Sequence, residues 1–97
     1  EDGTAINVCV GVAVLAGIAA SDAICAAALG ERSQDSDHLV AADLLARVDP
    51  KLGRQLRDLV ELKARSHYGH ALLTAAERKK ALRSAAALVA EARLRQP

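Results

Sequence analysis

The residues best suited to chemistry lie together between positions 62 and 70 of the chain. They are a lysine, an arginine, two histidines and the one tyrosine: Lys63, Arg65, His67, Tyr68 and His70. A histidine can act as a general base near neutral pH, and a neighbouring cation can stabilise the negative charge of a phosphoryl transition state. The same residue types also occur as structural groups at the end of a helix bundle. A functional site and a structural cluster are therefore both open interpretations.

Helical spacing divides this segment between two faces. Lys63 and His67 are four residues apart, so on a helix they share a face and point toward the edge of the apolar stripe. Arg65 lies on another face, four residues after Glu61, where an exposed ion pair is the structural alternative. His70 lies beyond the expected end of the helix. The positions of all these side chains depend on the helices that carry them.

Composition favours helices throughout the chain. Hydrophobic residues make up 52% of the 97 positions, but Met, Phe and Trp are absent and Tyr68 is the only aromatic residue. The core must therefore be built from Ala, Leu, Val and Ile, and alanine has the highest helix propensity. Strands would lack the aromatic residues that they favour. A chain of this length can bury enough surface for one core, so we expect one domain over residues 1–97.

Local signals indicate where the helices end. Gly30 suits a left-handed C-terminal cap, and Asp49 followed by Pro50 suits a helix start. Thr74 and Glu77 have the spacing of a capping box, which opens the last helix. The expected helices span about residues 4–29, 37–48, 50–68 and 75–95. Because the connections are short, successive helices should lie antiparallel, and the sequence predicts an all-α, antiparallel four-helix bundle.

One charged residue interrupts the first expected helix. Small residues recur there at every fourth position, which lets another helix approach closely; they are Cys9, Ala13, Gly17, Ser21 and Cys25. Asp22 lies beside them in an apolar stripe. An unpaired buried carboxylate would cost several kcal/mol. We therefore expect Asp22 to meet a basic group of the third helix, such as Lys63 or His67.

The cysteines and the apolar N-terminal stretch bear on location. Cys9 and Cys25 lie about 24 Å apart on one helix, too far to pair with each other. No Cys/His cluster has zinc spacing, so we expect two small buried residues of a reducing, cytoplasmic protein without metal or cofactor. The apolar run from Val8 to Ala20 is shorter than the roughly 20 residues of a spanning helix. We therefore expect no membrane partner.

Charge is divided between the two halves of the chain. Residues 1–50 hold two basic and eight acidic residues, a balance of −6, whereas residues 51–97 hold eleven basic and four acidic ones, a balance of +7. A short connection after the third helix would bring Arg78 and Lys79 beside its histidine-bearing end. That surface could bind RNA or an acidic partner protein. Alternatively, the two halves neutralise each other within the bundle or a dimer. The expected binding residues are Asp22, Lys63, His67, Tyr68, Arg78 and Lys79.

The order of helices and small residues resembles the HEPN superfamily. The similar stretches are residues 20–25 (ASDAIC), Asp37-His38 followed by Ala41, Ala42 and Leu44-Leu45, residues 59–69 (LVELKARSHYG) and the small and apolar positions of 81–92. HEPN proteins are compact helical bundles found in bacterial toxin–antitoxin systems, defence proteins and ribonucleases. The resemblance implies a bacterial, HEPN-like bundle associated with RNA or with a toxin–antitoxin partner.

The same resemblance has two implications for activity. Catalytic members carry an arginine followed a few residues later by a histidine, used in metal-independent RNA cleavage. Arg65 and His70 satisfy this spacing, although Gly69 would break the helix between them. An alignment on Tyr68 instead places Lys63 at the arginine position, which implies a variant without nuclease activity.

Three functions remain open. We expect a binding or regulatory module that is not catalytic. We also expect a homodimer, because an aromatic-free core gains modest energy per residue and benefits from burying more surface. The alternatives are a metal-independent endoribonuclease that uses Arg65 and His70, and a structural dimerisation domain.

Overall fold

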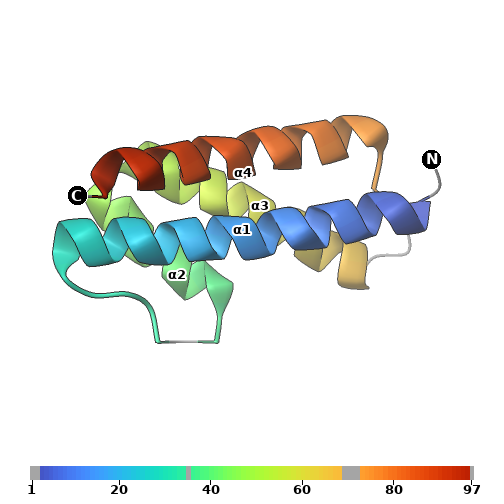
Figure 1. Cartoon of the computed structure of the whole chain (residues 1–97). Coiled ribbons are helices and arrows are strands. Elements are labelled where there is room, and N and C mark those ends of the chain that lie inside the picture. The colour runs from blue at the N-terminus through green and yellow to red at the C-terminus, as the bar shows by residue number, and fades with distance from the viewer. Residues whose placement is uncertain (1–2, 35, 69–72, 97) are drawn as a thin grey trace.

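Four α-helices make up the structure (Figure 1). The computed structural model describes residues 3–34, 36–68 and 73–96, with side chains described for 8–34, 36–65 and 73–96. The helices are α1 (Gly3–Leu29), α2 (His38–Val48), α3 (Pro50–Tyr68) and α4 (Ala75–Arg95), and no strand occurs in these ranges. The all-helical fold class predicted from composition is confirmed. Each helix begins within one residue of its expected start.

Local side chains set the helix ends. Gly30 follows α1 with a positive φ of 72°, a conformation that glycine adopts without steric cost. The Asp49 carboxylate accepts a hydrogen bond of 2.8 Å from the Lys51 N–H in the first turn of α3. At the start of α4, Thr74 Oγ1 accepts from the Glu77 N–H at 3.1 Å, and Glu77 Oε1 accepts from the Thr74 N–H at 2.9 Å. This reciprocal pair is the predicted capping box.

The helices do not alternate in direction along the whole chain. In Figure 1, α1 and α4 run side by side in the same direction, and α3 runs the opposite way. Arg47 in the last turn of α2 lies 3.6 Å from Glu31, just after α1, so the C-terminal ends of these two helices meet. The expectation that every successive pair lies antiparallel therefore does not describe α1 and α2.

Small residues let the helices approach closely at two places. A Cβ atom added to Gly17 of α1 would lie 2.9 Å from Leu59 Cδ1 of α3, and one added to Gly53 of α3 would lie 2.6 Å from Ala46 Cβ of α2. Around these contacts the buried core is built from Ala, Val, Ile and Leu with one cysteine; its largest fully buried members are Ile24, Leu45, Leu56, Leu59, Leu88, Val10, Val14 and Cys25. The core composition predicted from the sequence is the one observed.

Helix α1 is apolar on its outer side as well as its inner side. Its segment Val8–Leu29 has 22 residues and a mean hydropathy of 2.1, so by length and composition it could cross a membrane. The expectation that this stretch is too short counted only the residues before Asp22. It is wrong about the length, because the apolar segment continues to Leu29. A core helix passes the same test, and α1 packs its inner face against α3 and α4. That the protein has no membrane partner therefore stays a prediction from the sequence.

Candidate functional site

The expected site lies where the end of α3 meets the start of α4, and an ion pair joins the two helices there. The Arg65 guanidinium contacts Glu77 Oε2, while Oε1 of the same carboxylate accepts the Thr74 N–H of the capping box. Arg65 is exposed, whereas Glu77 is partly buried between the helices. Glu77 therefore stabilises the first turn of α4 and fixes the position of Arg65.

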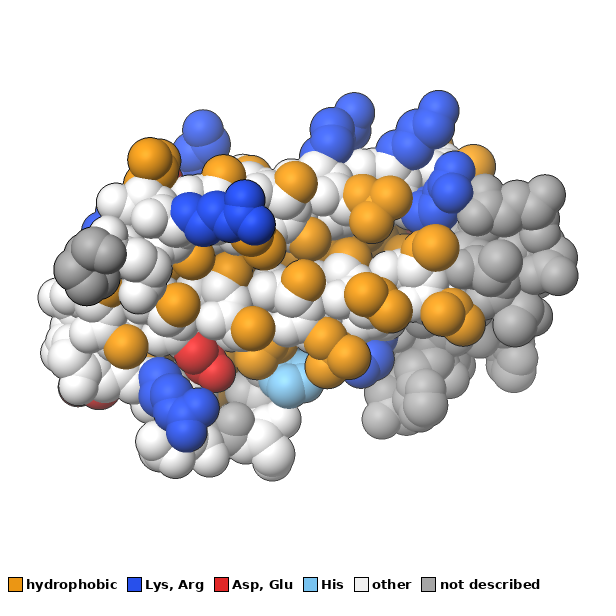
Figure 2. All heavy atoms as spheres, in the orientation of Figure 1, with side chains coloured by type: hydrophobic (Ala, Val, Ile, Leu, Met, Phe, Trp, Pro, Cys, Tyr) orange, Lys and Arg blue, Asp and Glu red, His pale blue; other side chains and the backbone are white. Residues whose placement is uncertain are grey.

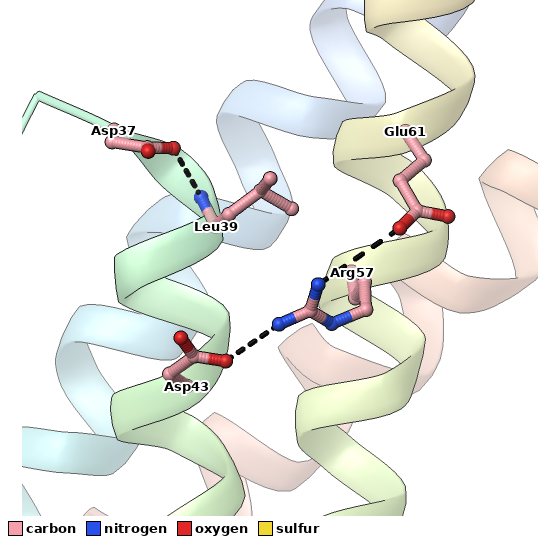
Figure 3. A network of polar contacts seen from close by, with 5 residues as sticks. All are labelled: Asp37, Leu39, Asp43, Arg57 and Glu61. Atoms are coloured by element: carbon pink, nitrogen blue, oxygen red, sulfur yellow. Dashed lines mark hydrogen bonds and ion pairs between the residues drawn. The ribbon is translucent and has the colours of Figure 1, made fainter.

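This pairing differs from the one expected within α3. The structural alternative for Arg65 was an ion pair with Glu61 one turn earlier, but the Glu61 carboxylate lies 3.9 Å from Arg57 instead. Arg57 also donates a hydrogen bond of 2.5 Å to Asp43 Oδ1 of α2 (Figure 3). In the same view Asp37 caps α2 by accepting from the Leu39 N–H at 2.9 Å. The Arg57 contacts tie α2 to α3, and exposed pairs of this kind contribute about 0–1 kcal/mol.

The other residues of the expected site are described to different extents. Lys63 is half-buried on α3 and has an interaction partner. On α4, Arg78 is half-buried and also has a partner, whereas Lys79 is exposed. The backbone of His67 and Tyr68 belongs to α3, but their side chains lie outside the described set, as does the whole of His70. The predicted Arg65–His70 pair is therefore untested.

A groove between α3 and α4 runs beside Arg65. Its volume is about 310 Å³, and its lining residues are Asp58, Glu61, Leu62, Arg65, Glu77 and Lys80. Three of these are carboxylates and two are cations. Because the arginine already contacts one of the carboxylates, the groove does not present the excess of positive charge that a phosphate needs. We expected cations that flank a histidine here. The described part of the groove instead contains three carboxylates beside the two cations.

Asp22 has a different partner from the one expected. Its carboxylate lies 3.8 Å from the Arg32 guanidinium in the connection after α1. Since α1 and α3 run in opposite directions past Gly17 and Leu59, Asp22 and Lys63 lie on opposite sides of that contact, roughly 15 Å apart at 1.5 Å per residue. The expectation of a basic partner on α3 was wrong for Lys63 because the sequence did not give the register of the two helices.

A second surface, on the side of α1 and α4, was not expected to be functional. Val8, Val12 and Leu15 of α1 are 61%, 60% and 62% exposed, and Leu82 of α4 is 46% exposed. Figure 2 shows hydrophobic side chains gathered across both helices on this face. We call it the α1/α4 face. Its signal in the sequence was the spacing of Val8, Val12 and Leu15, which places large apolar groups on the side of the helix opposite the small-residue stripe.

Positive charge borders the α1/α4 face. Lys79, Arg83 and Arg93 are exposed on α4, and within the described part of the chain none of them takes part in an ion pair. Lys80 is exposed too, but it lines the groove between α3 and α4 instead. In Figure 2 most of the visible basic side chains stand along the α4 edge of the view, and few acidic ones are visible. The three carboxylates described on α1 and α4 are each in an ion pair: Asp22 with Arg32, Glu77 with Arg65 and Glu91 with Arg95.

The cysteines and the metal-ligand residues form no site in the described ranges. Cys25 is buried and Cys9 half-buried, and both are free thiols. Burial raises the pKa of the Cys25 thiol, and a hydrogen bond with Ser21 partly opposes that shift. Among the described side chains, those of residues 8–34, 36–65 and 73–96, no three His, Cys, Asp or Glu groups are placed so as to hold a metal ion.

Known proteins give no further guide to the site. Comparison of the chain with protein-family models, with curated protein sequences and with solved structures gave no match.

Proposed function

We propose that this chain is a HEPN-like helical bundle that acts as a non-catalytic binding module for an anionic partner. The family assignment rests on the resemblance of residues 20–25 and 59–69 to HEPN stretches, together with four helices at the expected places. A cytoplasmic location, a toxin–antitoxin association and a homodimer remain predictions from the sequence.

The observation that carries the binding function is the set of unpaired cations on α4. Lys79 and Arg83 lie four residues apart on one side of the helix, where two like charges destabilise it by about 0.2–0.5 kcal/mol. An anionic partner would offset this repulsion, because neither Lys79 nor Arg83 is in an ion pair among the described residues.

The Arg65–Glu77 ion pair supports the non-catalytic part of the proposal. A ribonuclease of the expected type needs a guanidinium that is available to the phosphate. Here the guanidinium contacts a carboxylate that is itself held by the capping box. Binding a phosphate would require Arg65 to leave Glu77. This residue pair therefore favours a structural role for Arg65 over the endoribonuclease alternative.

The binding function can be tested on immobilised heparin, a sulfated polyanion. We expect the wild type to be retained and the Lys79→Glu/Arg83→Glu variant to elute at clearly lower salt, because both cations contact the polyanion. The matched control is Lys51→Glu/Arg54→Glu, which makes the same change in net charge on the exposed side of α3. Equal elution of the two variants would show that net charge alone governs retention, and would remove α4 as the binding element.

A further inference from the structure

We propose that the α1/α4 face docks an acidic, amphipathic helix of a partner protein. The inference rests on the proposed binding function and names its partner. It combines three properties of the face: an exposed apolar row on α1, a groove of small side chains between α1 and α4, and unpaired cations along α4.

The apolar row is continuous for three turns. Val8, Val12, Leu15 and Ala19 follow one another at helical spacing and are all exposed, and Leu82 and Ala86 continue the apolar surface on α4. From Val8 to Ala19 the row extends roughly 17 Å at 1.5 Å per residue, about the length of three turns of a partner helix. Scattered exposed hydrophobic residues are normal, whereas a contiguous patch indicates an interaction surface.

The shape of the face suits a helix. The helices α1 and α4 lie side by side in the same direction, and a groove of about 390 Å³ lies between the second half of α1 and the end of α4. Its lining residues are mostly alanine: Ala16, Ala19, Ala20, Val89, Ala92, Arg93 and Gln96. Side chains this small let the backbone of a third helix come close, and a row of its larger side chains can fill the groove.

Charge determines which helix fits. Arg93 lines the groove, and Lys79 and Arg83 stand on the exposed side of the same helix, all without ion pairs among the described residues. A partner helix with Leu or Val on one side and Asp or Glu beside them would bury the apolar row and neutralise these cations. A basic helix of the same apolar pattern would be repelled.

Two other occupants fit the observations less well. A second copy of the chain would bring the same unpaired cations of α4 to the interface, because the three carboxylates described on α1 and α4 are already paired. An anionic bilayer would match the charge, but the chain's only aromatic residue, Tyr68, belongs to α3 rather than to this face, so the aromatic anchors common on membrane surfaces are missing.

The test uses two synthetic helical peptides of about 18 residues, roughly 27 Å long as helices. Both carry leucine at helical spacing; one has glutamate at the flanking positions, and the other has lysine there. Fluorescence anisotropy of the labelled peptides measures binding to the full chain across a salt series. We expect the glutamate peptide to bind with a Kd on the order of micromolar, to weaken with salt, and to bind at least about tenfold more tightly than the lysine peptide.

Two variant pairs localise the binding. Val12→Ser/Leu15→Ser should weaken the glutamate peptide at least about tenfold, whereas Val40→Ser/Leu94→Ser, which removes exposed apolar groups elsewhere, should not. Lys79→Glu/Arg83→Glu should reverse the preference in favour of the lysine peptide. The Lys51→Glu/Arg54→Glu control should keep the original preference. Circular dichroism confirms that each variant is folded.

Several results would overturn the inference. They are no binding of the glutamate peptide to the folded protein, equal binding of both peptides, a dimer in light scattering that Val12→Ser/Leu15→Ser dissociates, or retention on phosphatidylglycerol vesicles that the same variant abolishes. The third would assign the face to a second copy, and the fourth to a bilayer. None of these four results concerns RNA cleavage. Cleavage of RNA would contradict the proposed non-catalytic function, but it would not affect the inference about the partner helix.

Discussion

Arg65 near the end of α3 and Glu77 in the first turn of α4, twelve residues apart, form an ion pair that joins these two consecutive helices. Glu77 also completes the capping box with Thr74. The Glu77 carboxylate thus both caps α4 and attaches α4 to α3. Arg65, which would be catalytic in a HEPN nuclease, therefore helps to hold α3 and α4 together.

Substitution of Glu77 should separate these two contributions. Glu77→Ala removes the cap and the ion pair, and we expect it to lower the free energy of unfolding by about 1–2 kcal/mol. Glu77→Gln can still close the capping box, so it should cost only the exposed ion pair, at most about 1 kcal/mol. Urea unfolding followed by circular dichroism measures both. Equal costs for the two variants would show that the Glu77 side chain contributes nothing as a cap, and a Glu77→Gln variant as stable as the wild type would show that the pair with Arg65 contributes nothing.

Two helical glycines should respond in opposite directions to alanine. A Cβ on Gly11 meets nothing within 4 Å, so Gly11→Ala should stabilise the protein by about 0.5–1 kcal/mol through helix propensity. A Cβ on Gly53 would lie 2.6 Å from the Ala46 Cβ and 2.9 Å from its backbone nitrogen, so α2 would have to move. Gly53→Ala should therefore destabilise by about 1–3 kcal/mol. A stabilising Gly53→Ala in thermal or urea unfolding would contradict the packing of α2 on α3.

Ionisation of Cys25 should make the fold weaker at alkaline pH. Burial raises the pKa of this thiol above its usual value, so the folded state holds the proton more tightly than the unfolded chain. Below the unfolded pKa, about 8.5, both states are protonated and stability is unaffected. Above it, the unfolded chain ionises first and stability falls. Unfolding midpoints of the wild type should drop more between pH 7 and pH 10 than those of Cys25→Ala; parallel curves for the two proteins would exclude this contribution.

Features of the fold that depend on neighbouring residues were predictable from the sequence. Gly30, the Asp49-Pro50 pair and the Thr74–Glu77 capping box each act within a few residues, and they place the helix ends where the structure has them. The core composition followed from the lack of aromatic residues. These are local or compositional properties, which periodicity and capping rules describe directly.

The pairing of distant residues was not predictable in the same way. The partners of Asp22 and Arg65 depend on the direction and register of packed helices. Helical spacing indicated Lys63 or His67 for Asp22 and, as a structural alternative, Glu61 for Arg65. The structure pairs them with Arg32 and Glu77. The α1/α4 face was missed for a related reason. An apolar helix surface indicates burial until the arrangement of the other helices shows which side they leave uncovered.

A bundle that binds an anionic partner without catalysis should leave RNA uncleaved. The most direct measurement incubates fluorescently labelled single-stranded RNA with the wild type, Arg65→Ala and His70→Ala in the presence of a chelator, and follows the length of the RNA over time. We expect intact RNA with all three proteins, because Arg65 is held by Glu77. Cleavage by the wild type that both substitutions abolish, with folding preserved, would contradict it and establish the endoribonuclease.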